Sequence, residues 1–368
     1  MPAGPSIESV NSTSASDWSQ EGEFVKGMKI TAFVFLMLLS MLGNALLIAV
    51  VYKNANQRMR TPSNYFIFNM ACADVLLTVY AVPDSIVDTA YSHQWLITGV
   101  AGELLCRLSQ FIGQMSVLVS TASLLVTALD RFFLVFYPLK RIITLRIARF
   151  LIGVIWIFAI VFTVPLFKMT TLVEFKPDFH VCTFNFGIIG YVIIYLLFCY
   201  PVVVLLPIIA IILIYAAIGF KLKHTIAPGN QLPSNQHRRE QMNRKILAML
   251  VTVVVVLIVC RFPLIFGTMA CFSGLNVVCS WNSLFLGWFL VCFNSGINPW
   301  IYFIFNEQFR QGARLLLQNL LPRCFKVTNE VVMLESTGRQ IKPHTSQTHE
   351  STRVEFSVKS REQIAQSK

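Results

Sequence analysis

Long apolar runs separated by short polar segments dominate the sequence. A helix needs about 20 mostly apolar residues to cross the hydrocarbon core of a bilayer, and the chain offers seven such stretches. They are expected at 30–52, 63–82, 108–129, 150–167, within 181–220, at 246–270 and at the end of the uncharged run 262–306. The pattern therefore predicts seven membrane-spanning helices, numbered here as spans one to seven.

Charges in the short connections predict the orientation of the spans, because Lys and Arg are retained on the cytoplasmic side. Cations follow spans one, three and five, namely Lys53, Arg58, Arg60, Lys140, Arg141, Arg146, Arg149, Lys221, Lys223, Arg238, Arg239, Arg244 and Lys245. Acids mark the N-terminal segment and the alternate connections, namely Glu8, Asp17, Glu21, Glu23, Asp84, Asp88, Glu103, Glu174 and Asp178. We therefore expect a multi-pass plasma membrane protein with its N-terminus outside.

Composition excludes several classes of protein. Hydrophobic residues make up 55% of the chain and charged residues only 13%, whereas soluble domains carry about 25% charged residues. The formal charge of +12 reflects the predicted topology, so it does not indicate nucleic-acid binding. Nine cysteines without a C-x-x-C pair indicate neither a zinc site nor a dense disulfide framework.

Other functions of membrane proteins receive little support from the sequence. No internal repeat is apparent, although many transporters consist of duplicated halves, and no polar path predicts a channel. The spans lack the clusters of His and acids that metal or acyl chemistry requires, so an enzyme is not expected.

Residues 1–28 contain no apolar h-region, and we expect no cleavable signal peptide. Glycosylation is expected at Asn11, in a sequon of the outside segment.

Few ionisable residues lie inside the spans, and each is a functional hypothesis because a charge in hydrocarbon is costly. Asp74 lies in span two and Arg261 in span six. Asp130 and Arg131 lie at the cytoplasmic end of span three. Considered alone, this pair is equally consistent with charges that simply extend to the membrane interface.

Every span carries a short motif at a characteristic place. The motifs are Gly43-Asn44, Asn69 to Asp74, Cys106 with Asp130-Arg131-Phe132, Trp156, Pro207 with Tyr215, Cys260-Arg261-Phe262-Pro263, and Asn298-Pro299-Trp300-Ile301-Tyr302 followed by Phe305 and Phe309. One motif would be weak evidence, but all of them occur in order. From about residue 30 to about residue 324 the chain resembles the class A, rhodopsin-like, G protein-coupled receptors.

The resemblance implies an all-α membrane protein, a seven-transmembrane helix bundle with a short amphipathic eighth helix. It divides the chain into an outside tail (1–28), a seven-transmembrane domain (29–305), an amphipathic cytoplasmic helix (306–321) and a disordered cytoplasmic tail (322–368). Such a receptor binds an extracellular ligand and activates a heterotrimeric G protein. Arrestin, a receptor kinase and the lipid bilayer are the other partners implied.

The resemblance also assigns an activation switch at the cytoplasmic end. Arg131 is expected to be held by Asp130 at rest and to meet the G protein when span six moves outward. Tyr215 and Tyr302 are its expected partners in the active state. The Asn298-Pro299 pair bends span seven, because a proline inside a helix removes a backbone donor and clashes with the preceding turn.

A sodium site is implied in the middle of the bundle. Asp74 resembles the sodium-binding carboxylate of the family, and the companion positions are occupied by Ser120, Asn294 and Ser295. Oxygen ligands suit a hard cation. The alternative is a set of polar contacts between helices without an ion, and no other cofactor is expected.

The resemblance assigns roles to several cysteines. It pairs Cys106 with Cys182 in a disulfide that ties the second outer connection to span three, and an oxidising exterior permits this bond. Cys271 and Cys279 flank the last outer connection and either form a second bridge or remain free thiols. Cys324 is a candidate palmitoylation site, with an unmodified thiol as the alternative.

The ligand class is constrained mainly by exclusion. Opsins carry a retinal-binding lysine where this chain has Cys292, and amine receptors carry an aspartate where it has Gly113. The expected pocket lining is Asp84, Gln110, Gly113, Gln114, Val117, Phe184, Phe186, Arg261, Leu264, Thr268, Leu284, Phe285 and Trp288. The outer acids Asp84, Asp88 and Glu103 would attract a basic group, which favours a neuropeptide. The alternatives are a small neutral or lipid-like ligand, or a receptor without a diffusible ligand. For Asp84 the alternative is a side chain that only extends outward to water.

Arg261 is the sharpest departure from the family, because most members have a tryptophan at this position. Arginine does not deprotonate in proteins, so a buried guanidinium needs an anion, several carbonyls or water. We favour Asp74 as its partner, in a pair that replaces sodium as the resting-state lock. A carboxylate on the ligand, or water with backbone carbonyls, are the alternatives.

Overall fold

The computed structural model describes residues 22–54, 59–225, 234–272 and 281–320. Within these residues seven helical segments are long and apolar enough to cross a membrane, which confirms the predicted number. In chain order they are α2 (Glu23–Tyr52), α3 (Pro62–Ala90), α4 (Gly99–Phe136), α5 (Leu145–Thr163) with the short α6 (Leu166–Met169), α7 (Ile189–Ile194) with the turn η2 (Tyr195–Cys199) and α8 (Tyr200–Thr225), α9 (Ser234–Phe272), and α10 (Trp281–Phe305). The amphipathic α11 (Glu307–Leu320) follows as the predicted eighth helix.

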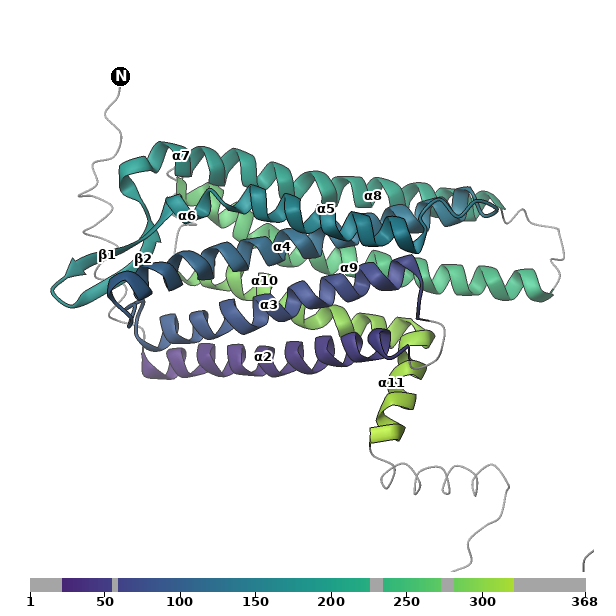
Figure 1. Ribbon diagram of the computed structural model, residues 1–368, viewed down its shortest axis with the longest axis horizontal. Coiled ribbons are helices and arrows are strands. Elements are labelled where there is room, and N and C mark those ends of the chain that lie inside the picture. Colours follow the sequence, from purple (N-terminus) through teal and green to yellow (C-terminus); the bar gives the residue numbers. More distant parts are fainter. Residues whose placement is uncertain (1–21, 55–58, 226–233, 273–280, 321–368) are drawn as a thin grey trace, which may run out of the picture. The chain divides into compact units, whose positions relative to one another are not determined.

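Neighbouring helices pack side by side in the bundle of Figure 1. α3 contacts α2 and α4, α4 contacts α5 and α8, and α10 contacts α9 and α2. Large apolar side chains fill the common core, including Leu47, Met70, Met249, Tyr302 and Phe309. Since Phe309 belongs to α11 and is fully buried, the eighth helix is anchored to the bundle by its apolar face.

Two helices start at threonine side chains. Thr61 Oγ1 accepts a hydrogen bond from the Asn64 backbone nitrogen at 3.3 Å, and Pro62 occupies the first position of α3. Thr144 Oγ1 accepts from the Ile147 backbone nitrogen at 3.4 Å at the start of α5. Such oxygens satisfy backbone donors that lack a partner within the helix, and proline fits where no donor is needed.

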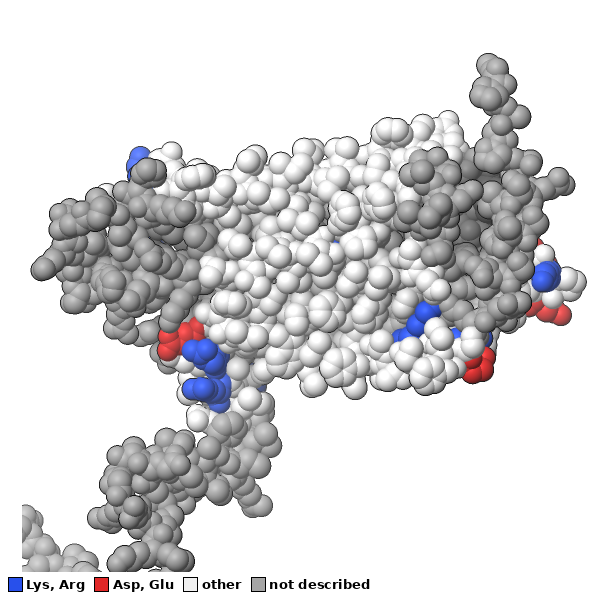
Figure 2. Space-filling view, turned by 180° about the vertical axis from the view of Figure 1, so that it is seen from behind, with Lys and Arg blue, Asp and Glu red and all other residues white. Residues whose placement is uncertain are grey.

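The outer faces of the helices are apolar, unlike those of a soluble protein. Leu42, Phe150 and Leu213 are 66%, 69% and 64% exposed. Figure 2 shows a broad band without charged side chains on one face, with acidic and basic residues towards its two ends. A bilayer imposes this distribution, because apolar side chains face the lipid and charges stay in water.

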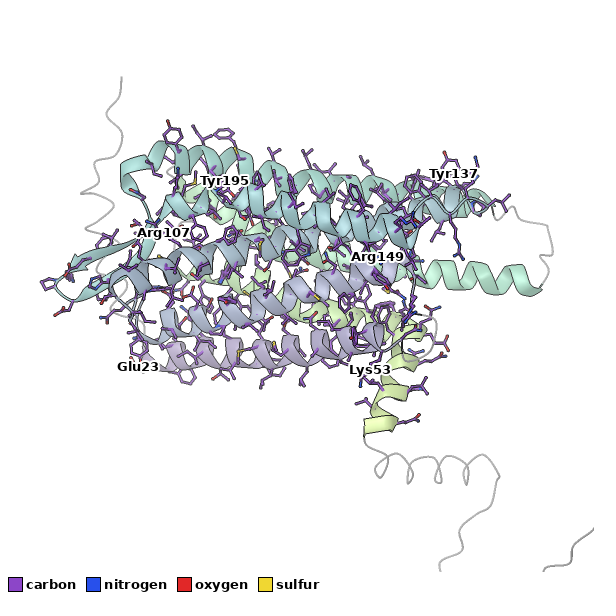
Figure 3. All side chains as sticks on the ribbon, viewed as in Figure 1. Glu23, Lys53, Arg107, Tyr137, Arg149 and Tyr195 are labelled. Atoms are coloured by element: carbon purple, nitrogen blue, oxygen red, sulfur yellow. A yellow bond between two sulfur atoms is a disulfide. The ribbon has the colours of Figure 1, made fainter. Side chains whose placement is uncertain are left out.

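The two ends of the bundle carry the residues that the charge pattern assigned to opposite sides of the membrane. Figure 3 places Lys53 and Arg149, both predicted to be cytoplasmic, at one end. Glu23 and Arg107 lie at the opposite end. Successive spans cross the membrane in alternate directions, so the end of the first span and the start of the fourth should lie on the same side. Lys53 follows the first span and Arg149 lies at the start of the fourth, so their positions agree with the predicted topology.

The connection between spans four and five contains a β-hairpin that the sequence analysis did not predict. β1 (Thr170–Lys176) pairs antiparallel with β2 (Phe179–Phe184), and Leu172 lies opposite Cys182. Asp178 in the turn has a φ of 61°, which Asp tolerates better than most residues. The short run of β1 alternates only weakly, so periodicity did not distinguish it from a loop. The helical bundle therefore carries a two-stranded sheet at the end where Glu23 and Arg107 lie (Figure 3).

Span five contains a second local feature that the sequence analysis missed. The turn η2 is π-helical and comes just before Pro201. A proline ring clashes with the carbonyl four residues earlier, and a widened turn accommodates it. Tyr195 in this turn donates its hydroxyl to the Phe162 carbonyl at 3.2 Å, which joins span five to α5.

α9 and α10 approach each other closely at Gly287. A Cβ atom there would lie 2.8 Å from Leu264 Cα and 2.9 Å from the Leu264 backbone nitrogen. Backbone atoms cannot move aside without separating the helices, so Gly287→Ala should lower the free energy of unfolding by about 1–3 kcal/mol. We expect a lower thermal unfolding temperature for the purified protein.

Gly153→Ala in α5 is the matched control, because no atom lies within 4 Å of its Cβ position. Alanine is favoured over glycine inside a helix by about 1 kcal/mol. The control should therefore unfold at an unchanged or higher temperature. Equal losses from the two substitutions would contradict the importance of the close approach.

Candidate functional site

The N-terminal end of α4 is joined to the hairpin by a disulfide and a carboxylate. The predicted Cys106–Cys182 disulfide is formed. One helical turn earlier, Glu103 accepts hydrogen bonds from the Leu172 backbone nitrogen at 2.9 Å and the Thr171 hydroxyl at 3.1 Å. Arg107 Nη2 lies 2.5 Å from Glu103 Oε1. Glu103 therefore positions the hairpin, which corrects its predicted role as a carboxylate that attracts a ligand.

The other two predicted outer acids lie on α3. Asp88 Oδ2 is 2.7 Å from His93 Nδ1, so this carboxylate already has a local partner. Asp84 is partly buried beside Ser109 of α4, and no basic side chain of the described residues lies within 4.0 Å of it. Asp84 is consequently the outer acid that is best placed to meet a ligand.

Trp288 of α10 reaches across the outer half of the bundle. Its Nε1 donates to Ser85 Oγ of α3 at 2.9 Å. Its ring lies 3.5 Å from the position where Gly113 of α4 would carry a Cβ atom. The missing side chain at Gly113 therefore leaves room for the indole. Since Ser85 adjoins Asp84, an aromatic ring and a carboxylate are brought into one region.

The remaining predicted pocket residues differ in burial. Those that are partly buried are Gln110, Gln114, Phe184, Leu264, Thr268, Leu284 and Phe285. Val117 is buried at 1% exposure.

Lys29 of α2 donates to Asn282 Oδ1 at 2.8 Å and lies 4.5 Å from the centroid of the Phe285 ring. This cation links the outer end of α10 to α2, a contact that sequence reasoning missed.

Asp74 belongs to a buried set of polar residues, called here the polar cluster, that comprises Asp74, Ser120, Asn294, Ser295 and Asn298. Asn298 Nδ2 donates to Asp74 Oδ2 at 3.4 Å, and Ser120 and Ser295 also face this carboxylate. Asn294 adjoins Ser295 on α10. Asp74 Oδ1, both serine hydroxyls and both polar atoms of the Asn294 amide are buried without a hydrogen-bond partner among the described residues.

Arg261 lies in α9 and is only 2% exposed. Its guanidinium nitrogens have no hydrogen-bond partner within the described part of the chain. The predicted direct ion pair with Asp74 is wrong, because no carboxylate oxygen there lies within 4.0 Å of the guanidinium. The reason is the packing of the helices, since α9 contacts mainly α10 and α8 rather than α3.

The predicted switch lies near the C-terminal end of α4. Asp130 is buried and accepts a hydrogen bond from the Ser63 hydroxyl of α3. The predicted resting contact between Asp130 and Arg131 is absent from this structure, because Ser63 holds the carboxylate and the two charged groups lie more than 4.0 Å apart. Arg131 lies within electrostatic range of Asp130, Tyr215 and Tyr302. Sequence reasoning missed Ser63, because a serine in the first turn of a helix is unremarkable.

The proline of span seven connects the polar cluster to α2. Pro299 has no backbone donor, so the carbonyl four residues earlier, at Ser295, lacks its usual helical partner. Asn44 Nδ2 donates to this carbonyl at 3.2 Å. Asn298 bonds to the polar cluster, and Tyr302 is fully buried one turn further on. The motifs of spans one and seven therefore satisfy each other's buried polar groups.

Several predicted sites lie outside the described residues. They are the glycosylation site Asn11, Cys279, the palmitoylation candidate Cys324 and the side chains of Cys271 and Phe186. Within the described residues, the free cysteines are Cys72, Cys199, Cys260 and Cys292. The second bridge and both modifications thus remain predictions.

Comparison with known proteins identifies the class to which this site belongs. Residues 43–302 match the family described as 7 transmembrane receptor (rhodopsin family). Because the match covers most of the chain and agrees with the fold, the protein belongs to this family and is a G protein-coupled receptor.

Individual relatives are receptors named for neuropeptides. The chain is 29% identical to neuropeptide receptor 22 of Caenorhabditis elegans over 86% of this chain and 75% of that protein. It is 30% identical to neuropeptide FF receptor 1 of Homo sapiens over 84% of this chain and 74% of that protein. It is 36% identical to neuropeptide Y receptor type 2 of Sus scrofa over 64% of this chain and 60% of that protein.

Glu103→Ala should loosen the hairpin while the disulfide remains. The substitution removes the acceptor of the Leu172 backbone donor and of the Thr171 hydroxyl. We expect faster amide hydrogen exchange across residues 170–184, with the largest change at Leu172, because its donor becomes exposed to water.

Arg107→Ala is the control for this prediction. It removes the cation beside Glu103 but retains the hydrogen bond between Glu103 and the Leu172 backbone. Exchange at Leu172 should change much less than in Glu103→Ala. Unaltered exchange in Glu103→Ala would show that the disulfide alone fixes the hairpin.

Proposed function

We propose that this receptor binds an extracellular peptide that carries a basic group, and that Asp84 pairs with that group. The observation that carries the proposal is the environment of the three outer acids. Glu103 and Asp88 have partners within the receptor, whereas Asp84 is partly buried and has no cation beside it among the described residues. A partly desolvated carboxylate attracts a cation more strongly than one in open water.

The names of the relatives support a peptide as the ligand class. Neuropeptide FF receptor 1 and neuropeptide Y receptor type 2 are named for peptides. The surroundings of Asp84 suit such a ligand, because Trp288 bonds to the adjacent Ser85 and supplies aromatic surface. A small neutral or lipid-like ligand would use the apolar surface but would gain nothing from the carboxylate.

The proposal includes an orientation and a set of partners. The N-terminus and the hairpin face the outside of the plasma membrane, where Asn11 is glycosylated. The basic end faces the cytoplasm, where the receptor couples to its G protein and Cys324 anchors the tail to the bilayer. A receptor kinase phosphorylates Thr345, Ser346, Thr348, Ser351 and Thr352, and the added charge recruits arrestin. The location of Lys53 and Arg149 at the end opposite Glu23 supports this orientation, because Lys and Arg are retained on the cytoplasmic side.

Asp84→Asn should weaken activation by peptides with a basic residue. Loss of a charge-assisted hydrogen bond costs about 1.5–3 kcal/mol, which corresponds to roughly a ten-fold to hundred-fold loss of potency. The measurement is a second-messenger assay in transfected cells, using a library of synthetic peptides to find an agonist. The agonist is then compared with an analogue in which citrulline replaces arginine.

Two controls accompany this prediction. Asp88→Asn removes an acid of the same helix that already contacts His93, and it should change potency little. The citrulline analogue lacks the charge that Asp84 would pair with, so it should be weaker than the agonist on the unmodified receptor and should lose little further potency on Asp84→Asn. Equal potency of the basic agonist on the unmodified receptor and on Asp84→Asn would remove Asp84 from the site and favour a neutral ligand.

Arg131→Ala should abolish G protein activation and leave agonist binding largely intact. Arg131 lies at the cytoplasmic end of α4, within range of Tyr215 and Tyr302, where an outward-moving α9 would uncover it. We expect loss of the second-messenger response at normal surface expression.

Arg149→Ala provides the matched control, because Arg149 is an exposed arginine at the same end of the bundle. It should retain most of the response, since removal of one exposed charge has a small effect. Full signalling by Arg131→Ala at normal expression would contradict the proposed switch.

A further inference from the structure

A second arrangement of charge lies deeper in the bundle than the proposed peptide site. It involves Arg261 and the polar cluster around Asp74. Buried polar atoms normally have hydrogen-bond partners, and groups that lack a protein partner mark places where water or an ion binds. The buried atoms without partners include Asp74 Oδ1, Ser120 Oγ, Ser295 Oγ and the Asn294 amide, together with Ser116 Oγ and the Arg261 guanidinium.

The oxygens of the polar cluster fit sodium by chemistry alone. Hydroxyl, amide and carboxylate oxygens are the ligands that a hard cation prefers. Asp74 is the acid of the polar cluster. The described residues contain no group of three or more His, Cys, Asp or Glu side chains that could hold a metal ion together. A sodium ion would therefore depend on the single negative charge of Asp74.

Arg261 changes this balance of charge. Its guanidinium is 2% exposed, and Asp74 is the acid within its electrostatic range, with Tyr200, Cys260 and Cys292 as the other nearby groups. One carboxylate and one guanidinium make the region neutral. A sodium ion would add a net positive charge to a buried site, where an uncompensated charge is costly. The full set of residues therefore does not fit the ion, although the oxygens do.

We propose that Arg261 takes the place of sodium as the counter-charge of Asp74, acting across ordered water rather than by direct contact. The groups lie too far apart for an ion pair, yet each has free hydrogen-bonding capacity, and so do the hydroxyls of Ser120 and Ser295. A buried water needs two to four polar partners, which these atoms supply. The arrangement makes the receptor insensitive to sodium.

The alternative of a ligand carboxylate on Arg261 is less consistent with the structure. Its guanidinium is almost completely buried, whereas the residues around Asp84 are only partly buried. A ligand would have to displace packed side chains to reach it. The buried Arg261 guanidinium needs a negative charge nearby. Asp74 supplies that charge whether or not a ligand is bound, and no side chain has to move.

The test uses purified full-length receptor and requires neither an agonist nor a G protein. Its outcome is thus separate from that of the peptide proposal. Thermal unfolding is measured in sodium chloride and in N-methyl-D-glucamine chloride, each at about 0.15 M. A bound ion stabilises the folded state by mass action, so a sodium site raises the unfolding temperature in sodium chloride only. For the unmodified receptor we expect equal unfolding temperatures in the two salts.

Arg261→Met removes the charge while retaining a long apolar side chain. It should create a sodium-dependent rise of several degrees, because Asp74 and its oxygens then face no counter-charge. Adding Asp74→Asn to this variant should abolish the rise. Arg107→Met is the matched control, because Arg107 lies at the outer end of α4, and it should show no dependence on sodium.

Two results would overturn the proposal. One is a sodium-dependent rise in the unmodified receptor, a measurement that does not depend on whether any variant folds. The other is the absence of a sodium effect in a folded Arg261→Met variant, which would show that Arg261 is not what excludes the ion. If Arg261→Met fails to fold, Arg261→Gln replaces it, because glutamine is neutral and can hydrogen-bond to the same water.

Discussion

The structure depends on one constraint, which is that the hydrocarbon core of a membrane offers no hydrogen bonds. Every backbone and side-chain polar group at that depth must find its partner inside the protein. The bundle meets this demand by turning polar residues inward and apolar ones outward. Pro299 shows the constraint at a single atom, because it deprives the Ser295 carbonyl of its helical donor and Asn44 of another helix supplies the replacement.

The same constraint applies to α10, which connects the proposed ligand region, the polar cluster and the proposed switch. Near its outer end Trp288 bonds to Ser85 of α3 and packs on Gly113 of α4. In its middle Asn298 bonds to Asp74, and one turn later Tyr302 is completely buried beside the cytoplasmic switch. A displacement of this helix would alter the proposed ligand region, the polar cluster and the proposed switch together, because each depends on a side chain that α10 contributes.

The outer end follows a different principle, since water is available there and order has to be imposed. The hairpin is held by a covalent bond and by Glu103, which accepts hydrogen bonds from its backbone and from Thr171. Glu103 is engaged within the receptor, whereas Asp84 has no cation beside it among the described residues. The proposal that Asp84 contacts the ligand therefore rests in part on the contacts that hold the hairpin.

The sequence by itself determined the class of fold, the seven spans, the eighth helix and the Cys106–Cys182 pairing, because burial in lipid and a one-per-span set of motifs leave strong local signals. Tertiary structure decided which polar groups meet. Ser63 rather than Arg131 contacts Asp130, Glu103 binds a hairpin, and Arg261 stays out of contact with Asp74. These outcomes depend on distances of a few ångströms between helices far apart in the chain, and neither hydrophobic periodicity nor residue type encodes such distances.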